Sequence, residues 1–239
     1  MGVCIATGKM SKKAETSKRK RKQVQPARRV SSWASPIILT VLVIGTFLIR
    51  TLPSWNKVFV GGEVWFRGVD SWYHMRLVDN MMVNFPLPLK WDMSILFPSG
   101  MSVGYFPLLS WIVALPGQIL DYEVVGALLP PILGALILIP VYFICKTLWR
   151  DWVGLIACML VMLLPSELFH RTLLGFTDHH MLEVLFLATT VLFLILLAKE
   201  EKPRWVVLGG VSLGLYTVSY THLRAHETSL HLVCRLLLE

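Results

Sequence analysis

Long apolar segments are the feature that most constrains how this chain can fold. Residues 33–52 form a first segment whose length matches the roughly 20 residues that an α-helix needs to cross a bilayer. Hydrophobic residues make up 55% of the sequence and charged residues 16%, against about 25% charged residues in a soluble domain. The further apolar segments are residues 103–120, 124–145, 152–169, 181–198 and the shorter 205–220. The sequence therefore predicts an all-α, polytopic membrane protein.

Positive charge is concentrated at the N-terminus. Residues 1–32 contain ten of the 23 lysines and arginines and one acid, Glu15, so the rest of the chain carries 13 bases and 14 acids. No aromatic residue interrupts the basic stretch, which argues against a nucleic-acid surface that stacks on bases. A basic segment ahead of a membrane helix is typical of the cytoplasmic side. We expect residues 1–32 to be a disordered cytoplasmic tail and residues 33–52 to remain attached, because no small-residue cleavage site follows them.

Charges between the later segments constrain the topology. Two groups of basic residues lie between the apolar segments that follow residue 120. If residues 103–120 crossed the membrane, both groups would lie outside, against the positive-inside bias. Prolines and glycines in that segment also interrupt a helix. We therefore expect it to lie against or dip into the membrane, within a long external loop of residues 53–123, so that Asp70 and residues 175–180 share the external face. The basic groups are Lys146 with Arg150, and Lys199 with Lys202 and Arg204.

Asp70 is the first candidate for chemistry. It precedes Ser71-Trp72-Tyr73-His74, and an aspartate at that place is typical of a helix N-cap. If the segment is helical, Asp70 and His74 lie on one face. Charged groups beside hydrocarbon are costly and usually functional, and capping is compatible with ligation, so both roles stay open.

The second candidate is residues 175–180, between two apolar segments. Asp178 and His180 are two positions apart, so in an extended segment their side chains point the same way. They offer a carboxylate oxygen and an imidazole nitrogen to one divalent cation. The alternative is that Thr177 or Asp178 only caps the next helix, with His179 and His180 at the membrane interface.

Two motifs together carry a resemblance to a known family. Asp70–Arg76 reads D-x-x-Y-H-x-R, with KWD and FPSG downstream, and R-x-x-x-G-x-x-D-H-H follows more than 100 residues later. This pattern resembles the catalytic subunit of oligosaccharyltransferase over about residues 33–220. The resemblance implies a membrane enzyme of the GT-C type. Such an enzyme transfers an oligosaccharide from a polyprenyl (pyro)phosphate carrier to the asparagine amide of an N-x-S/T acceptor protein or peptide.

The resemblance also implies roles for particular residues. Asp70 matches the family's first-loop aspartate, and Asp178 and His180 match its D-x-H pair, so all three are expected to bind Mn²⁺ or Mg²⁺. Asp70 is expected to be catalytic as well, by holding the acceptor amide. Arg171 lies seven residues before Asp178 and is expected near the substrate phosphate, although an arginine at the end of a span also often extends to the interface.

The family pattern implies a longer enzyme than this sequence. It includes a later external acid, further spans and a C-terminal globular domain with a WWD-type motif, none of which occurs here. We therefore expect residues 33–220 to be the N-terminal part of a transmembrane catalytic domain, inactive by itself. Residues 221–239 contain three of the seven histidines and are expected to be a non-native or frameshifted tail.

Two alternatives remain at this point. One is another GT-C glycosyltransferase that uses a lipid-linked single sugar and shares only the first-loop acid. The other is a non-enzymatic membrane subunit or transporter fragment, in which Asp70 and Asp178 only cap helices. In the leading interpretation the protein lies in the cell membrane of a prokaryote or in the endoplasmic reticulum membrane, with its active site on the external or lumenal face.

Overall fold

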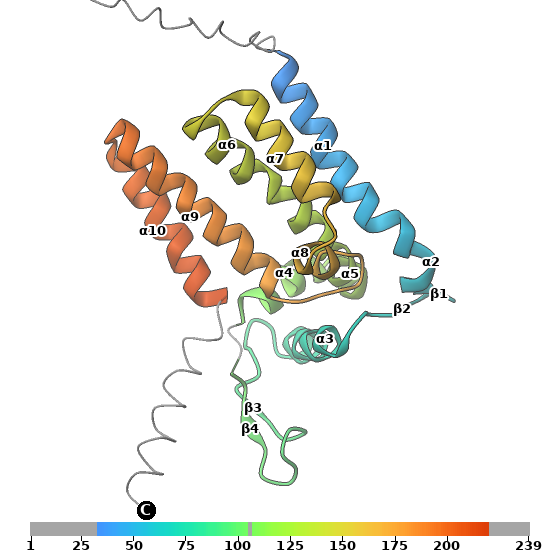
Figure 1. Cartoon of the computed structure of the whole chain (residues 1–239). Coiled ribbons are helices and arrows are strands. Elements are labelled where there is room, and N and C mark those ends of the chain that lie inside the picture. Colours follow the sequence, from blue (N-terminus) through green and yellow to red (C-terminus); the bar gives the residue numbers. More distant parts are fainter. Residues whose placement is uncertain (1–32, 105–106, 220–239) are drawn as a thin grey trace, which may run out of the picture.

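The computed structural model describes residues 33–104 and 107–219, which are mostly helical (Figure 1). The expected tails, residues 1–32 and 221–239, lie outside the described residues. The elements in chain order are α1 (Ala34–Thr51), η1 (Leu52–Ser54), α2 (Trp55–Val58), β1 (Phe59–Val60), β2 (Glu63–Val64), α3 (Val69–Val83), β3 (Trp91–Asp92), β4 (Met101–Ser102), α4 (Leu108–Gly117), α5 (Tyr122–Leu136), α6 (Leu138–Leu148), α7 (Asp151–Leu163), α8 (Glu167–Arg171), α9 (His180–Glu200) and α10 (Pro203–Ser219).

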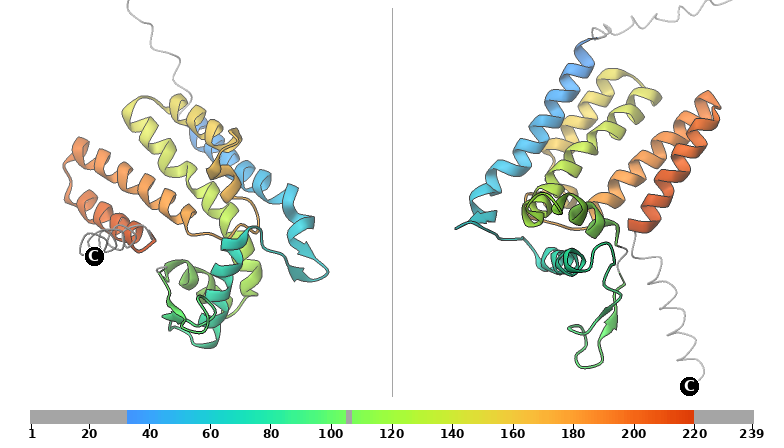
Figure 2. Two further views of the ribbon diagram at one scale, coloured as in Figure 1. Left: turned by 60° about the horizontal axis from the view of Figure 1, so that its bottom comes forward. Right: turned by 180° about the vertical axis from the view of Figure 1, so that it is seen from behind.

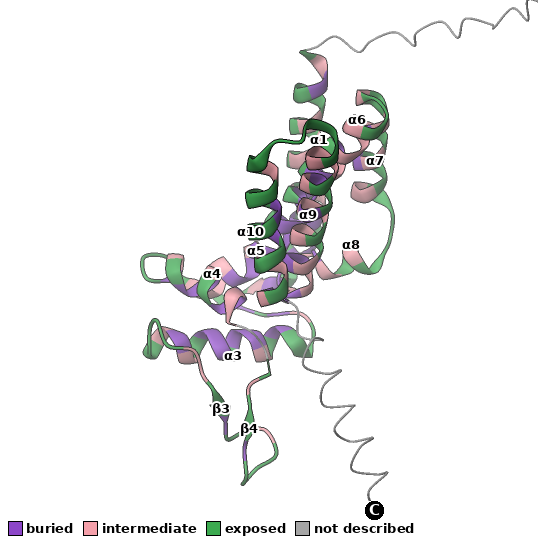
Figure 3. Ribbon diagram, turned by 90° about the vertical axis from the view of Figure 1, so that its left-hand side faces the viewer, coloured by how far each residue is buried: buried purple, intermediate pink, exposed green. Residues whose placement is uncertain are grey.

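Three helical stretches in the described part of the chain are long and apolar enough to cross a membrane. They are Ala34–Val58, Tyr122–Leu148 and His180–Glu200, and they confirm the predicted helical membrane fold. Helix α4 has ten residues and is therefore about 15 Å long, which is too short to cross. It lies beside α3 across one end of the bundle (Figure 3).

The structure divides the apolar segment 152–169 into two helices, α7 and α8. Helix α7 ends at Leu163, and Leu164 has an extended backbone with ψ of 124°. Pro165 follows, and its ring disfavours the helical conformation for the residue before it. The chain then forms the short helix α8 at a different angle, which brings Arg171 to the end of the bundle (Figure 1).

The connections between helices fall into two groups at opposite ends of the bundle (Figures 1 and 2). The start of α1 and the α6–α7 and α9–α10 connections lie at one end, and α3, α8 and the start of α9 lie at the other. The Lys199 ammonium donates a hydrogen bond to the Thr147 carbonyl, so the two expected basic groups are neighbours. The α3 helix and residues 175–180 share the opposite end, where His74 of α3 lies 3.5 Å from Asp178.

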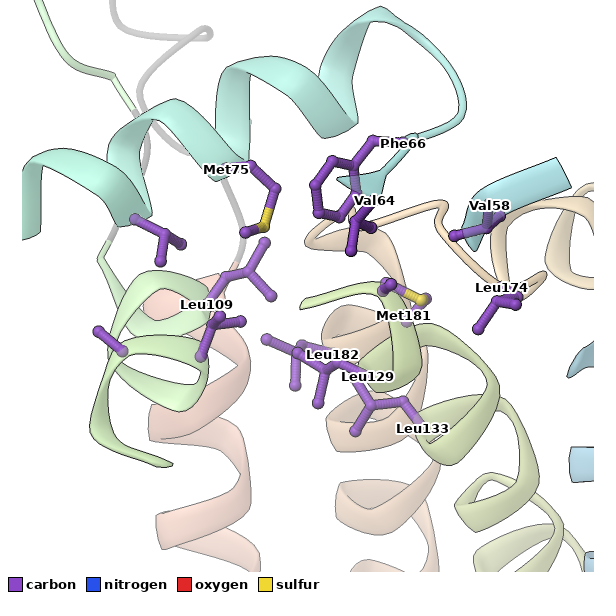
Figure 4. Close-up of a cluster of buried hydrophobic side chains, with 14 of the residues drawn as sticks. Val58, Val64, Phe66, Met75, Leu109, Leu129, Leu133, Leu174, Met181 and Leu182 are labelled. Carbon is purple, nitrogen blue, oxygen red and sulfur yellow. The ribbon is translucent and has the colours of Figure 1, made fainter. Parts of the chain in front are cut away.

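The main hydrophobic core fixes α3 and α4 to the beginnings of α5 and α9 (Figure 4). Helix α3 buries one face, with Ser71, His74, Met75, Val78 and Met81 at the spacing of an amphipathic helix. Burying one Met or Leu side chain contributes about 2 kcal/mol, so several such residues hold this layer in place. Other core members are Val58, Val64, Phe66, Leu109, Val113, Leu129, Leu133, Leu174, Met181 and Leu182.

A buried arginine joins α1 to the segment that leads into α9. Arg50 is fully buried; its Nε donates to Thr172 Oγ1 at 2.7 Å and its Nη2 donates to the Val161 carbonyl at 3.2 Å. The Arg50 carbonyl also accepts from the Leu174 N–H at 3.1 Å. The polar end of α1 thus anchors the chain on both sides of Arg171.

Gly175 allows the turn that directs the chain toward Asp178. Its φ is +78°, and a Cβ added there would lie 2.9 Å from a methyl group of Val58. Its N–H donates to the Ala127 carbonyl, and its carbonyl accepts from the Arg67 N–H. The backbone conformation and the close packing both require glycine.

We predict that Gly175→Ala destabilises the fold by about 1–3 kcal/mol, the typical penalty for a left-handed non-glycine residue. Gly210→Ala is the matched control, because Gly210 is an exposed helical residue with open space around it, and alanine there is favoured by roughly 0.5–1 kcal/mol. Unfolding in detergent, followed by circular dichroism, measures both changes. Equal stability of the two variants would contradict this account of the turn.

Candidate active site

Asp178 lies at the centre of a group of cationic and imidazole side chains between α8 and α9. Its side chain is fully buried. Oδ2 accepts from Arg171 Nη1 at 2.5 Å and lies 3.9 Å from His180 Nε2. Oδ1 accepts from the His179 backbone N–H at 2.7 Å, and lies 2.8 Å from His179 Nδ1 and 3.5 Å from His74 Nε2.

These partners keep the buried Asp178 carboxyl ionised. Burial by itself raises the pKa of Asp178, but hydrogen bonds from His179 and His74 and the nearby charges of His179 and His180 lower it well below its ordinary value. Burial lowers the pKa of Arg171, and its hydrogen bonds to Glu167 and Asp178 raise it above its ordinary value. The end of the bundle therefore contains a stable negative charge with a stable positive charge beside it.

The alternative that Thr177 or Asp178 only caps α9 does not describe this geometry. Thr177 Oγ1 donates to the Gly126 carbonyl at 2.8 Å, so it holds the segment against α5. Asp178 accepts one backbone N–H, from His179 at the start of α9. It also lies within 4 Å of four side chains: His74 of α3, Arg171 of α8, and His179 and His180 at the start of α9. Capping is therefore only part of its role.

The two other residues expected as ligands occupy different places. His180 is the first residue of α9 and lies next to Asp178. Asp70 lies in the first turn of α3, where it is exposed. The α3 N-cap is Gly68, so Asp70 does not cap the helix. The side chain of α3 that reaches Asp178 is instead His74, which is buried.

Two groups of side chains within the described ranges, 33–104 and 107–219, have the donor atoms and spacing of a metal site. One is His74, Asp178 and His179, and the other is His179, His180 and Glu183, with the donor atoms of each group within 4.8 Å of one another. Carboxylate oxygens and imidazole nitrogens suit divalent cations such as Mn²⁺ and Zn²⁺. Glu183 Oε1 is buried and accepts no hydrogen bond, which leaves a lone pair free. These residues fit a divalent cation.

Sequence reasoning missed His74, His179 and Glu183 as members of the site. A signal was available for Glu183, because it stands three residues after His180 and four after His179 in a predicted helix. A signal also existed for His74, as the expected same-face partner of Asp70. The burial of His74 against a segment 105 residues away had no signal in the sequence.

Arg171 and His180 line one cavity of about 340 Å³ beside the site. The guanidinium donates from Nε to Glu167 Oε1 at 2.7 Å and lies 5.8 Å from the centre of the Phe176 ring. Its side chain is 26% exposed, so it remains accessible to a ligand in the cavity. A planar guanidinium matches the geometry of a phosphate group. The arrangement can bind an anion next to a cation site.

The helical membrane bundle and the buried carboxylate–imidazole group define a polytopic membrane protein in which a group of side chains at one end fits a divalent cation. The family model described as "Oligosaccharyl transferase STT3, N-terminal" matches residues 30–237. The chain therefore belongs to this family of glycotransferases, which confirms the resemblance drawn from the two sequence motifs.

Archaeal relatives support the assignment. "Dolichyl-phosphooligosaccharide-protein glycotransferase 3" of Archaeoglobus fulgidus is 30% identical over 204 residues, which cover 76% of this chain and 23% of the relative. "Dolichyl-monophosphooligosaccharide--protein glycotransferase AglB" of Haloferax volcanii is 30% identical over 223 residues, which cover 81% of this chain and 21% of the relative. The chain thus spans less than a quarter of the length of these two relatives.

Solved structures of an Archaeoglobus fulgidus oligosaccharyltransferase have the same fold. The form tethered to an acceptor peptide containing the NVT sequon has a TM-score of 0.74 at 26% identity and covers 79% of this chain and 24% of that protein. The complex with Zn and sulfate has a TM-score of 0.71 at 28% identity, and the match covers 76% of this chain and 25% of that protein. The matched region includes the transmembrane helices, in agreement with the predicted fold class.

We predict that Asp178→Asn lowers the free energy of unfolding strongly. Removing one partner of a buried ion pair costs about 3–5 kcal/mol. Because Arg171 is partly exposed, we expect a loss of stability near the lower end of this range. Asp151→Asn is the control, because Asp151 pairs with Lys146 while both side chains are at least 40% exposed, a setting worth under about 1 kcal/mol. Unfolding in mixed detergent micelles compares the two variants, and equal losses would contradict a structural requirement for the Asp178 charge.

Proposed function

We propose that this chain forms part of the active site of a lipid-linked oligosaccharide–protein glycotransferase. The observation that carries the proposal is the convergence of Asp178, His180 and Arg171 at one end of a membrane bundle of the STT3 family. The donor is a polyprenyl (pyro)phosphate-linked oligosaccharide, and the acceptor is the asparagine of an N-x-S/T protein or peptide. Structures of the Archaeoglobus relative with an NVT-containing peptide and with dolichol-phosphate support both classes of substrate.

Asp178 and His180 are the proposed ligands of Mn²⁺ or Mg²⁺, with Asp70 as a third. The 3.9 Å between Asp178 Oδ2 and His180 Nε2 is short enough for both atoms to reach one ion at about 2.0–2.2 Å. Asp70 is exposed at the start of α3, and the same helix carries His74 to Asp178. The cation would supply Lewis-acid neutralisation of the charge on the departing phosphate.

Arg171 is the proposed phosphate-binding residue. It lines the cavity beside His180, and its guanidinium offers N–H groups to phosphate oxygens in a planar arrangement. Asp178 keeps one of these N–H groups in place through its 2.5 Å bond, so the side chain is oriented before a ligand binds. This preorganisation reduces the entropy lost on binding.

Asp70 is the proposed catalytic residue for the acceptor. An asparagine amide nitrogen is a poor nucleophile because its lone pair is delocalised. A carboxylate that accepts hydrogen bonds from the amide N–H groups orients it toward the sugar, and this positioning lowers the barrier. The exposure of Asp70 leaves its carboxylate free to meet an acceptor.

Membership of the STT3 family argues against the two alternatives. A GT-C enzyme for a single lipid-linked sugar would share the first-loop acid without requiring the Asp178-x-His180 pair, and a non-enzymatic subunit or transporter fragment would use Asp70 and Asp178 only as caps. Asp70 does not cap α3, and Asp178 pairs with Arg171, His74 and His179.

The proposed location is the cell membrane of a prokaryote or the endoplasmic reticulum membrane, with a cytoplasmic N-terminus and the site on the external or lumenal face. The basic groups near Thr147 and Lys199 lie together at the end opposite α3, which the positive-inside rule assigns to the cytoplasm.

Cysteine labelling tests this orientation. Ser99 and Glu201 are exposed; Ser99 lies in the β3–β4 connection and Glu201 in the α9–α10 connection. These two connections lie at opposite ends of the structure (Figure 1). Each cysteine is introduced into a variant that lacks the native cysteines and is produced in the cell membrane. We expect Ser99→Cys to react with an impermeant maleimide in intact cells. Glu201→Cys should react only after the cells are opened. The reverse pattern would overturn the orientation while leaving the fold unaffected.

We expect the 239-residue chain alone to transfer no glycan, because its matched part spans less than a quarter of the two curated archaeal relatives. Remote contacts supply binding energy that holds a poor nucleophile in place. Fusing residues 1–219 to the region of the Archaeoglobus relative that follows its matched segment should produce transfer to an N-x-T peptide with Mn²⁺ and lipid-linked donor. Asp178→Ala in that fusion should abolish transfer. Transfer by the chain alone would show that the matched region is sufficient.

A further inference from the structure

Glu183 lies in the first turn of α9, on the same side as two imidazoles of the site. His180 is three residues before it and His179 four residues before it, so all three side chains are neighbours on the helix surface. The Glu183 side chain is only 12% exposed. A negative charge at this place also interacts favourably with the positive end of the helix dipole.

The two carboxylate oxygens face different imidazoles. Oε2 lies 2.9 Å from His180 Nδ1, and Oε1 lies 3.6 Å from His179 Nε2. The first distance is a hydrogen bond and the second is longer than one. His179 thereby lies between two carboxylates, with its Nδ1 2.8 Å from Asp178 Oδ1.

The hydrogen bond to Glu183 decides which nitrogen of His180 carries the proton. An ionised carboxylate can only accept hydrogen bonds, so His180 Nδ1 must donate. In the neutral imidazole the other nitrogen, Nε2, then keeps its lone pair. That nitrogen is the one on the Asp178 side, 3.9 Å from Oδ2. The geometry therefore directs the basic nitrogen of His180 toward the proposed cation.

We propose that Glu183 is a positioning residue that orients His180 for cation binding by holding its proton on Nδ1. This inference rests on the proposed cation site of Asp178 and His180. Carboxylate–histidine–metal arrangements of this kind fix the ring orientation and raise the basicity of the ligand nitrogen. Glu183 does not touch the substrate in this role; it acts through His180.

Glu167 shows why this role belongs to Glu183. Glu167 is also near the site, but its side chain is 74% exposed and it pairs with Arg171. Glu183 is enclosed beside the rings of His179 and His180, whose centres lie 4.2 Å apart. Of these two acids, the enclosed one can restrict the orientation of an imidazole.

Cation affinity of the purified chain in detergent provides the first test, with Mn²⁺ followed by electron paramagnetic resonance. We expect Glu183→Ala to weaken Mn²⁺ binding roughly 10- to 100-fold. Glu183→Gln should weaken it less, because the amide carbonyl still accepts from Nδ1. Glu200→Gln is the matched control, since Glu200 is the last residue of α9 and pairs with Lys202 and Arg204; its affinity should equal that of the wild type.

Nitrogen NMR of ¹⁵N-histidine-labelled, metal-free chain provides a second readout. His180 should carry its proton on Nδ1 in the wild type and in Glu183→Gln, and should shift toward the Nε2–H form in Glu183→Ala. If Glu183→Ala does not fold, the wild-type tautomer and the Gln variant decide.

The outcomes separate the two proposals. Absence of Mn²⁺ binding by the wild type would overturn the cation site and the positioning role together. Wild-type binding that neither Glu183 variant changes, or a wild-type His180 with its proton on Nε2, would overturn the positioning role alone.

Discussion

The burial of one carboxylate, Asp178, organises the functional end of this protein. A charge removed from water costs several kcal/mol unless other groups replace its hydration. Here the replacement comes from separate elements: Arg171 from α8, His74 from α3 and His179 at the start of α9. Each of these elements must be in place for the charge to be tolerated. The electrostatic requirement therefore links the layer of α3 and α4 to the membrane-spanning helices.

Backbone constraints bring Asp178 to that position. Gly175 turns the chain with a positive φ, Thr177 bonds to the Gly126 carbonyl, and Arg50 bonds to Thr172, the residue directly after Arg171. These contacts come from α1 and α5, so both helices support a segment that has little regular structure of its own. A rigid scaffold beneath an irregular segment is a common way to position reactive side chains.

The geometry separates roles among the acids of the site. Asp178 is enclosed and has a lowered pKa, so it suits binding and orientation, whereas Asp70 is exposed and suits contact with an incoming acceptor. Glu183 is enclosed and directed at imidazole nitrogens. Arg171 pairs with the buried acid and lines the cavity, so the proposed phosphate-binding group lies beside the proposed cation. In the proposed mechanism the same chemical group, a carboxylate, serves three purposes, and the three carboxylates differ in burial and neighbours.

Local features of the sequence determined the helical membrane fold, because hydrophobic length and prolines act on the residues that contain them. The Asp178-x-His180 pair and its resemblance to oligosaccharyltransferase were equally readable, since both depend on short spacings and on motifs. The pairing of Asp178 with His74, the burial of Arg50 and the exposure of Asp70 depended on tertiary structure. Asp178 and His74 are more than 100 residues apart in the sequence, and Asp70 and His74 share a helix yet differ in burial. Only the packing of the α3–α4 layer on the starts of α5 and α9 decides which of the two side chains meets the buried charge, because helical periodicity defines a face but not what covers it.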